Sequence, residues 1–172
     1  MPNLPAALPM AQFAIRTSER PLASDRVARR ARPEDAGAFR DLVRDAYRPY
    51  IKRMGQMPGP MLDDYDANIS QHQVWVVEQN CDIIGGLVLM AKADHLLLDN
   101  IAVHPSFQGS GVGRLLLNLA DEEAKRQGYL TIQLYTHETM VENIAMYMNL
   151  GWAEIDRRTV GRYPRIYMQK TF

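Results

Sequence analysis

The sequence predicts a single domain of mixed α/β class, and three observations lead to this. The chain has 172 residues, 47% of them apolar and 23% charged, which suits one domain with a substantial core. Apolar residues recur with a period of two in some stretches and at helical spacing in others. No repeat or linker interrupts this pattern. The predicted order is β-α-α-β-β-β-α-β-α-β-β.

The beginning of the chain differs from the rest in composition. Residues 1–25 contain four prolines and show no sustained hydrophobic period. Six arginines fall within residues 1–32, against two acidic residues. We therefore expect residues 1–25 to be a loosely ordered extension and residues 26–172 to be the folded domain.

The first helix has a clear start and a clear end. An alternating stretch over 26–32 predicts a strand, and Pro33 with the acidic Glu34 and Asp35 marks the first turn of a helix. Apolar residues then follow at helical spacing: Ala36, Phe39, Leu42, Val43, Ala46, Tyr47 and Tyr50. The segment 55–60 is rich in glycine and proline and must end this helix, and residues 61–69 predict a second, shorter one.

The period changes to two after His72. Strands are expected over 74–78 and 83–91, joined by a turn over 80–82, and Gly85-Gly86 marks a bulge or a close approach of backbone. Further elements are expected in the order strand 96–103, helix 112–127, strand 130–135, helix 140–149 and strands 153–160 and 165–170.

A turn dense in glycine joins strand 96–103 to the helix that follows. Unpaired N–H groups and the helix dipole favour an anion at a helix start, and glycines at 109, 111 and 113 let a phosphate approach them. The turn lacks the Lys-Ser or Lys-Thr of an ATP-binding loop. Its glycine spacing also differs from the dinucleotide-binding fingerprint. The sequence therefore predicts a diphosphate site of another kind.

The helix expected from Met140 carries two candidate polar residues. Thr139 and Glu142 have the spacing of a capping box, and Gly151 can end the helix in a left-handed conformation. Asn143 and Tyr147 are four residues apart and so point the same way. We expect the apolar side formed by Val141, Ala145 and Met148 to face the sheet. Asn143 and Tyr147 then form either a catalytic surface or an ordinary solvated one.

Two motifs resemble those of the GCN5-related N-acetyltransferases, the GNAT superfamily. The first is Gln108-x-x-Gly111-x-Gly113, and the second is Glu142-Asn143-x-Ala145-x-Tyr147-x-x-Leu150-Gly151-Trp152. The order of elements matches as well, so that the resemblance covers about residues 26–170. It implies a GNAT-like mixed sheet, mostly antiparallel, with helices on both faces.

The resemblance also implies roles for individual residues. Backbone groups of Ile101, Ala102 and Val103 would bind the pantetheine arm of acetyl-CoA, and one N–H would polarise the thioester. The pyrophosphate would bind the turn and helix start formed by Gln108, Gly109, Ser110, Gly111, Val112, Gly113 and Arg114. Asn143 would bind the pantetheine or acetyl end, and Tyr147 would protonate the leaving thiolate. The acetyl group would pass directly to an amine.

The base that accepts the amine proton is not settled by the sequence. Asp99 is the first candidate, because many relatives place an acid on this strand, although it could instead bond backbone where two strands separate. His137 is the second candidate, since an imidazole titrates near neutral pH. Glu138 and an ordered water are further alternatives.

Other classes of function receive less support. Basic and acidic residues balance at 20 each, so that neither nucleic acid nor a membrane surface is indicated as a partner. The apolar run 83–91 is too short to cross a bilayer. The four histidines lack metal-ligand spacing, so we expect no metal. The chain has a single cysteine, Cys81, which excludes an internal disulfide and suits the cytoplasm. Cys81 has no histidine near it in the sequence, so an acyl-cysteine mechanism is not indicated.

The acceptor is predicted only as a class, a primary amine of a small molecule or of a protein N-terminus. Met54, Met57 and Met61 flank the proline-rich turn, which in this family covers the acceptor site. The arginines at 157, 158, 162 and 165 form either a solvated face or a site for an acidic acceptor. The alternatives to an enzyme are an acyl-CoA sensor without turnover and, more distantly, a nucleotide-binding module of another fold. A second copy of the chain could cover the edge left by the last strands.

Overall fold

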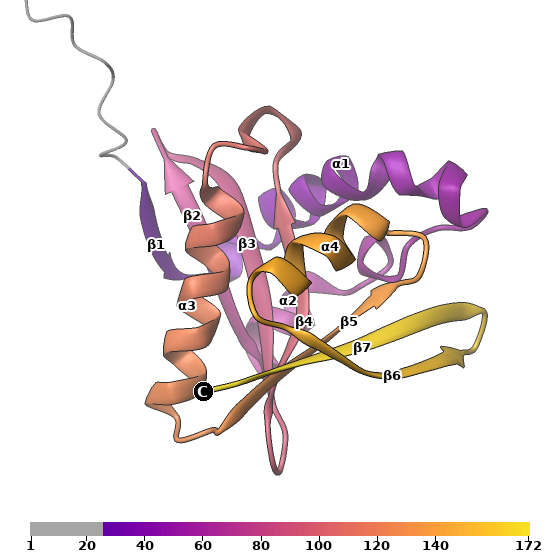
Figure 1. Ribbon diagram of the computed structural model, residues 1–172. Coiled ribbons are helices and arrows are strands. Elements are labelled where there is room, and N and C mark those ends of the chain that lie inside the picture. Colours follow the sequence, from indigo (N-terminus) through magenta and orange to yellow (C-terminus); the bar gives the residue numbers. More distant parts are fainter. Residues whose placement is uncertain (1–25) are drawn as a thin grey trace, which may run out of the picture.

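A seven-stranded sheet forms the centre of the protein, and helices cover both of its faces (Figure 1). The computed structural model describes residues 26–172. The strands lie in the order β1-β2-β3-β4-β5-β7-β6, and each neighbouring pair is antiparallel except β4 and β5. The mixed, mostly antiparallel class that the sequence predicts is therefore confirmed. The expectation for residues 1–25 lies outside the described residues.

Figure 1 labels the elements along the chain. The strands are β1 (Val27–Arg30), β2 (Gln73–Gln79), β3 (Asp82–Ala91), β4 (Leu96–Val103), β5 (Thr131–His137), β6 (Ala153–Val160) and β7 (Tyr163–Thr171). The helices are α1 (Ala36–Met54), α2 (Tyr65–Gln71), α3 (Val112–Arg126) and α4 (Val141–Asn149). Residues of α1 and α2 share one core cluster, whereas residues of α3 and α4 share the cluster on the opposite face.

The second helix begins later than the sequence predicts. A helix is expected over 61–69, whereas α2 runs from Tyr65 to Gln71. The Asp64 carboxylate accepts a hydrogen bond from the Ala67 N–H at 3.0 Å and so fixes the helix start. The preceding residues Gly59–Met61 form one turn of 3₁₀ helix instead. The later start leaves Asp63 in a loop rather than on a helix.

Gly85 and Gly86 hold helices from opposite faces close to β3. A Cβ atom at Gly85 would lie 2.7 Å from a methyl carbon of Val112 in α3. A Cβ atom at Gly86 would lie 2.6 Å from the ring of Phe39 in α1 and 2.7 Å from the carbonyl oxygen of Trp75. Any larger side chain would therefore push a helix away from the sheet. The expected close approach is confirmed at both glycines.

A bulge at Asp99 changes which face each residue of β4 occupies. Leu89 pairs with Leu98 and Val88 with Asn100, so that Asp99 has no partner on β3. Leu98 packs in the cluster with α3, whereas Ala102 packs in the cluster with α1. Strict alternation would put both on the same face. The extra residue also turns Asn100 toward α1 and α2.

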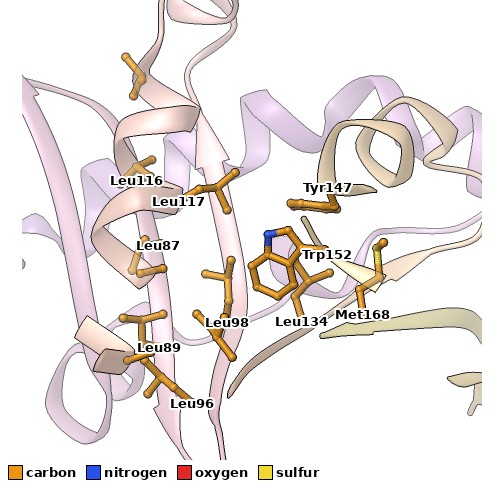
Figure 2. Packing of buried hydrophobic residues seen from close by; sticks show 14 of the residues in the cluster. Leu87, Leu89, Leu96, Leu98, Leu116, Leu117, Leu134, Tyr147, Trp152 and Met168 are labelled. Atoms are coloured by element: carbon orange, nitrogen blue, oxygen red, sulfur yellow. The ribbon is translucent and has the colours of Figure 1, made fainter. Parts of the chain in front are cut away.

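The larger core cluster lies between α3, α4 and the sheet. Figure 2 shows Leu116 and Leu117 of α3 close to strands β3 and β4, with Tyr147 and Trp152 continuing the same cluster. The rings of Tyr147 and Trp152 have their centroids 6.0 Å apart. This contact holds Trp152 against α4.

The expected start of α4 is wrong in its chemistry. Thr139 and Glu142 do not form a capping box, because the residue at the cap position is Met140 and no side chain caps it. The Oγ1 of Thr139 lies 2.8 Å from Nδ1 of His137, and Glu142 accepts a hydrogen bond from Arg53 of α1 at 2.7 Å. Glu142 is thus used in a tertiary contact, and Thr139 in a local contact with the residue two positions before it. At the other end Gly151 is left-handed, with φ 88°, as expected.

The expected buried side of α4 is also wrong. Val141, Ala145 and Met148 are exposed, whereas Tyr147 is buried and Asn143 and Ile144 are half-buried. The N–H of Trp152 donates to the carbonyl of Tyr147, which turns the indole back under the helix. Packing against that indole rotates the polar pair inward. The face with Asn143 and Tyr147 therefore looks into the protein.

Candidate active site

The glycine turn, residues 108–113, presents bare backbone at the start of α3. Gly109 and Gly111 have φ of 75° and 90°, a left-handed conformation that side chains disfavour. No side chain caps α3, and a Cβ atom at either glycine would meet nothing within 4 Å. The first N–H groups of α3 therefore lack partners within the helix and face open space. This geometry suits a phosphate group.

Arg26, the residue before β1, supports the glycine turn, a contact that the sequence does not reveal. Its guanidinium donates to the carbonyl oxygen of Ser110 at 2.7 Å and to the Ser110 hydroxyl at 3.1 Å. A third bond, from Nε to Gln79, holds the side chain in place. A positive charge thus lies beside the expected anion site, 84 residues away along the chain from Ser110.

Strands β4 and β5 separate beside the glycine turn. They pair in parallel over Leu96–Leu98 of β4 and no further. Because the N–H of His104 bonds to Ile84 on β3, the alternating antiparallel pattern directs the backbone groups of Ile101 and Val103 away from β3. The Val103 carbonyl accepts instead from the Gln108 amide at 3.2 Å. The gap between the strands is thus lined by backbone groups of β4.

A cavity of about 310 Å³ opens where the two strands separate. Its walls come from four parts of the chain: the end of α1 with the proline turn (residues 55–60), the strands β4 and β5, helix α4, and strand β7. Tyr147 and Asn143 line it from α4, and Ile101 lines it from β4. The volume lies at the small end of the range for ligand pockets.

Tyr147 is the candidate proton donor to the sulfur. The residue is 5% exposed and lines the cavity. Burial, and to a smaller extent the charge of Tyr50, raises the pKa of Tyr147 above its usual range. Its hydroxyl makes no hydrogen bond within residues 26–172. The phenol is therefore a neutral donor at physiological pH that is free to bond a ligand atom.

Asp99 lines the same cavity from the bulge of β4. One of its carboxylate oxygens accepts a hydrogen bond from the Tyr135 hydroxyl at 2.7 Å. Burial and the charge of Asp99 raise the pKa of Tyr135, so that this phenol stays a donor. The second carboxylate oxygen of Asp99 has no hydrogen-bond partner among residues 26–172. The arrangement leaves Asp99 able to accept a proton.

His137 lies in the cavity wall, but its hydrogen bonds suit a donor better than a base. Its Nδ1 accepts from the backbone N–H of Thr139 at 3.2 Å. A neutral ring then carries its proton on Nε2. That atom is buried and has no partner within the described residues. Burial also lowers the pKa of His137. Glu138 is exposed and does not line the cavity.

The cavity has a charged end, formed by Asp63, Asp99, Tyr135, Tyr163 and Arg165. The sequence singled out Asp99 and Arg165 separately, but it did not predict that the two meet, and it assigned no role to Asp63. Burial, together with the charge of Asp99, raises the pKa of the Asp63 carboxyl to about 6. The Arg165 guanidinium lies 4.0 Å from the centroid of the Tyr135 ring. These residues come from the loop before α2, from β4, from β5 and from β7. A pattern in one stretch of sequence could not have shown that they meet.

Comparison with known proteins assigns the family. Residues 70–154 match the family model described as acetyltransferase (GNAT) domain. These residues form a GNAT acetyltransferase domain. The matched residues run from the end of α2 to the start of β6 and include the glycine turn, Asn143 and Tyr147. The resemblance inferred from the two motifs is thus confirmed.

Curated relatives of this GNAT domain carry related names. An uncharacterized N-acetyltransferase, YjgM, of Escherichia coli is 31% identical over 103 residues, which cover 56% of this chain and 62% of that protein. The [ribosomal protein bS18]-alanine N-acetyltransferase of Haemophilus influenzae is 33% identical over 87 residues, 51% of this chain and 58% of that protein. The chain thus spans about three fifths of the length of these relatives.

Solved structures share the GNAT fold over almost their whole length. PaiA N-acetyltransferase of Thermoplasma acidophilum, in complex with coenzyme A, matches with a TM-score of 0.71 at 18% identity, covering 86% of this chain and 99% of that one. An acetyltransferase of Streptococcus agalactiae matches with a TM-score of 0.72, also at 18% identity, covering 87% of this chain and 99% of that one. At identities this low, these matches establish the fold of the chain and nothing more.

Within residues 26–172 no group of three or more His, Cys, Asp or Glu side chains is arranged to hold a metal ion. None of their helices is both long enough and apolar enough to span a membrane. Cys81 is an exposed free thiol in the turn between β2 and β3.

Proposed function

We propose that this chain transfers an acetyl group from acetyl-CoA directly to a primary amine. The observation that carries the proposal is the continuity of three features on β4: the glycine turn after it, the backbone groups exposed along it, and the cavity at its bulge. Asp99 lies four residues before Val103, about 13 Å along a strand. A ligand anchored at the glycine turn and extended along β4 would therefore bring its end into the cavity.

The residues present fit coenzyme A at both ends. Unpaired N–H groups of α3, with Arg26 and Arg114 nearby, suit a pyrophosphate. The exposed backbone of Ile101 and Val103 suits the amide groups of a pantetheine arm, which would add to β4 as a further strand does. The half-buried Asn143 offers an amide close to the cavity. The PaiA structure named above contains coenzyme A, which supports this assignment by analogy.

The reaction needs one bond made and one broken. The neutral amine nitrogen attacks the thioester carbonyl carbon, the new C–N bond forms, and the C–S bond breaks with its electrons going to sulfur. A backbone N–H of β4 would stabilise the oxyanion of the intermediate. The amine loses one proton and the thiolate gains one, so the products are the acetamide and the free thiol.

Tyr147 and a carboxylate divide the proton transfers. The neutral Tyr147 phenol would hydrogen-bond the sulfur and stabilise it as negative charge develops. A raised pKa makes it a weaker acid than a free phenol but keeps it in the donor form. Asp99, or Asp63 beside it, would accept the ammonium proton. His137 remains an alternative base, as in the sequence-based hypothesis.

A homodimer through the edge strand β6 and a cytoplasmic location remain predictions. The mechanism requires only a primary amine, which either a small molecule or a protein N-terminus supplies. The names of the two relatives differ in the acceptor: the Haemophilus influenzae protein is named for the alanine of a ribosomal protein, and the name of YjgM gives no acceptor.

Thiol release measured with purified protein, acetyl-CoA and a panel of amines tests the proposal. We expect release that depends on the amine, together with a rise in melting temperature on adding CoA. If CoA stabilises the protein while no amine is acetylated, the chain is an acyl-CoA sensor. If no CoA species shifts the melting temperature, both functions are excluded.

A further inference from the structure

We infer that the charged end of the cavity selects a small zwitterionic acceptor, an amino acid or close analogue, whose carboxylate binds Arg165 while its amine faces Asp63 and Asp99. This inference rests on the proposed acetyltransferase function and adds the class of acceptor. It depends on the position of Arg165, on the charges of Asp63 and Asp99, and on the contacts that join the proline turn to the last hairpin.

The four arginines of the last hairpin do not share one environment. Arg157 and Arg158 are exposed and lie within 3.1 and 3.2 Å of the carboxylates of Glu154 and Asp156. Arg165 is half-buried, lines the cavity and makes no ion pair within residues 26–172. Arg157 and Arg158 therefore belong to a solvated face, whereas Arg165 is able to bind an acidic acceptor. Arg165 is the one placed to meet a ligand.

Arg165 makes no ion pair within residues 26–172, although it lies close enough to Asp63 for its charge to oppose the rise in the pKa of that carboxyl. Its guanidinium lies 4.0 Å from the Tyr135 ring centroid and 6.0 Å from that of Tyr163. The Tyr135 hydroxyl is itself fixed by its bond to Asp99. Stacking on an aromatic face leaves the N–H fork of an arginine free for a planar anion. A carboxylate can accept two of these N–H groups at once.

Two carboxylates, those of Asp63 and Asp99, line the same end of the cavity as Arg165. Asp63 and Asp99 line it together, close enough for the charge of Asp99 to affect Asp63. Neither carboxylate has an ion-pair partner within the described residues. A simple cationic amine would satisfy the two carboxylates but would leave Arg165 covered and unpaired, which is costly. A zwitterion satisfies both kinds of charge.

The closure of the charged end favours a small acceptor over a polypeptide. The proline turn is tied to the last hairpin by two bonds of 2.8 Å, from the Tyr163 hydroxyl to the Met57 carbonyl and from the Gln56 amide to the Arg162 carbonyl. Residues of the proline turn and Tyr163 both line the cavity. These contacts join two walls of the cavity. The remaining space suits a molecule of amino-acid size.

Matched pairs of acceptors test the inference. Each α-amino or ω-amino acid of a panel is compared with its amide, which keeps the amine and removes the carboxylate charge, at saturating acetyl-CoA. We expect kcat/KM to be at least about tenfold higher for the acid in the best pair, the size of one charge-assisted contact. In Arg165→Gln this ratio should fall to near one, because the acid loses activity and the amide does not.

Two variants serve as controls. Arg157→Gln removes an exposed, paired arginine of the same hairpin and should leave the acid-to-amide ratio unchanged. Asp63→Asn should lower kcat/KM for acid and amide alike, because both carry the amine. A merely structural role of Arg165 would lower acid and amide equally in Arg165→Gln.

Binding measured by calorimetry with CoA present separates the two levels of the proposal. Acids that bind when their amides do not, without turnover, would support the acceptor class and overturn the acetyltransferase function. Equal use of acid and amide by the wild-type protein, or a preference for a peptide amine, would overturn the acceptor class while leaving the function intact. Absence of binding by any acid, with no amine acetylated, would overturn both.

Discussion

The two ends of the candidate active site are built on different principles. The glycine turn binds through backbone groups of one continuous stretch, residues 108–113, at the start of one helix. The charged end consists of side chains from four separate segments, and Asp63 and Arg165 lie 102 positions apart in the chain numbering. The glycine turn depends on the local backbone conformation, whereas the charged end depends on tertiary packing.

The family match follows this division only in part. Residues 70–154 contain the glycine turn, Tyr147 and, from the charged end, Asp99 and Tyr135. Asp63, Tyr163 and Arg165 lie outside them. Backbone recognition of a common cofactor can be shared by many proteins, because it depends on few side chains. Acceptor recognition can change with single side chains at the other end. The comparison therefore predicts that substitutions at the two ends have separable effects.

Tyr147→Phe acts where the two ends meet, and we expect the largest effect there. Loss of the phenol should lower kcat about 10²-fold, the size of one proton-transfer contribution, while the Kd for CoA stays unchanged because the ring still packs on Trp152. Stopped-flow or steady-state thiol release with separate CoA titration measures both quantities.

The control for Tyr147→Phe is Tyr129→Phe, whose hydroxyl bonds to the Lys92 carbonyl outside the cavity. It should retain full kcat. If Tyr147→Phe weakens CoA binding by the same factor as it lowers kcat, Tyr147 binds the cofactor and takes no part in the chemical step.

Asn100→Ala tests how far the charged end depends on its supporting side chains. Asn100 is 3% exposed, accepts from the Tyr47 hydroxyl at 2.8 Å and donates to the Tyr65 hydroxyl at 3.0 Å. The Tyr65 hydroxyl in turn donates to the Pro60 carbonyl in the proline turn at 2.8 Å. Losing this bridge should cost about 1–3 kcal/mol of unfolding free energy, measured by urea denaturation.

In the same variant the Kd for CoA should change little, because the glycine turn does not touch this network. Asn118→Ala, at an exposed position of α3, should alter stability by less than about 0.5 kcal/mol. A loss of CoA affinity equal to the loss of stability would mean that the two ends are not separable.

Gly111→Val is the corresponding change at the glycine turn. A β-branched residue at φ 90° costs about 1–2 kcal/mol, so the CoA-binding conformation should be lost and Kd should rise about tenfold. Isothermal titration with CoA measures this. Gly128→Val places the same side chain at φ 82° at the other end of α3 and should leave the Kd unchanged. Equal weakening in both variants would point to a general loss of fold.

The sequence predicted the glycine turn well because its information is local. Three glycines between an apolar strand and an amphipathic helix fix the conformation wherever the rest of the chain lies. The strand 96–103 was predicted with its correct ends for the same reason. Tyr147, singled out as the proton donor, lines the cavity, although the helix face that carries it was expected to be turned the other way. Its role as donor stays a prediction.

Asp99 and Arg165 were singled out from the sequence, but their meeting with Asp63 in one cavity was not predicted, because it depends on how four separate segments pack. Asp63 faces the cavity because Asp64 delays the start of α2. Asp99 occupies a bulge, which a pattern with period two cannot show. Thr139 and Glu142 have the sequence of a capping box, but His137 and Arg53 bind them instead. The Arg53–Glu142 contact joins residues far apart in the sequence, whereas the Asp64 cap and the Thr139–His137 contact are local alternatives to the predicted helix starts.

The pH dependence of Asp63 gives the smallest expected effect and tests the charged end alone. Its carboxyl has a pKa of about 6 in the folded protein, against 3.8 as the ordinary value. If ionised Asp63 holds the amine, kcat/KM for the acceptor should fall below pH 6 with a slope of one proton. Asp63→Asn should remove that limb, while CoA binding should keep its own pH dependence.

The same pKa fixes the sign of a stability effect. Because the folded state holds the Asp63 proton more tightly than the unfolded state, ionisation opposes folding. The stabilising contribution of protonated Asp63 is complete below about pH 4 and is lost as pH rises to about 6. Asp63→Asn should therefore be more stable than the wild type at pH 7.5 and not at pH 4, measured by thermal unfolding. Asp82→Asn, at an exposed position of the β2–β3 hairpin, should show no such difference. A gain of equal size at both pH values would mean that the asparagine acts through packing rather than through the charge of Asp63.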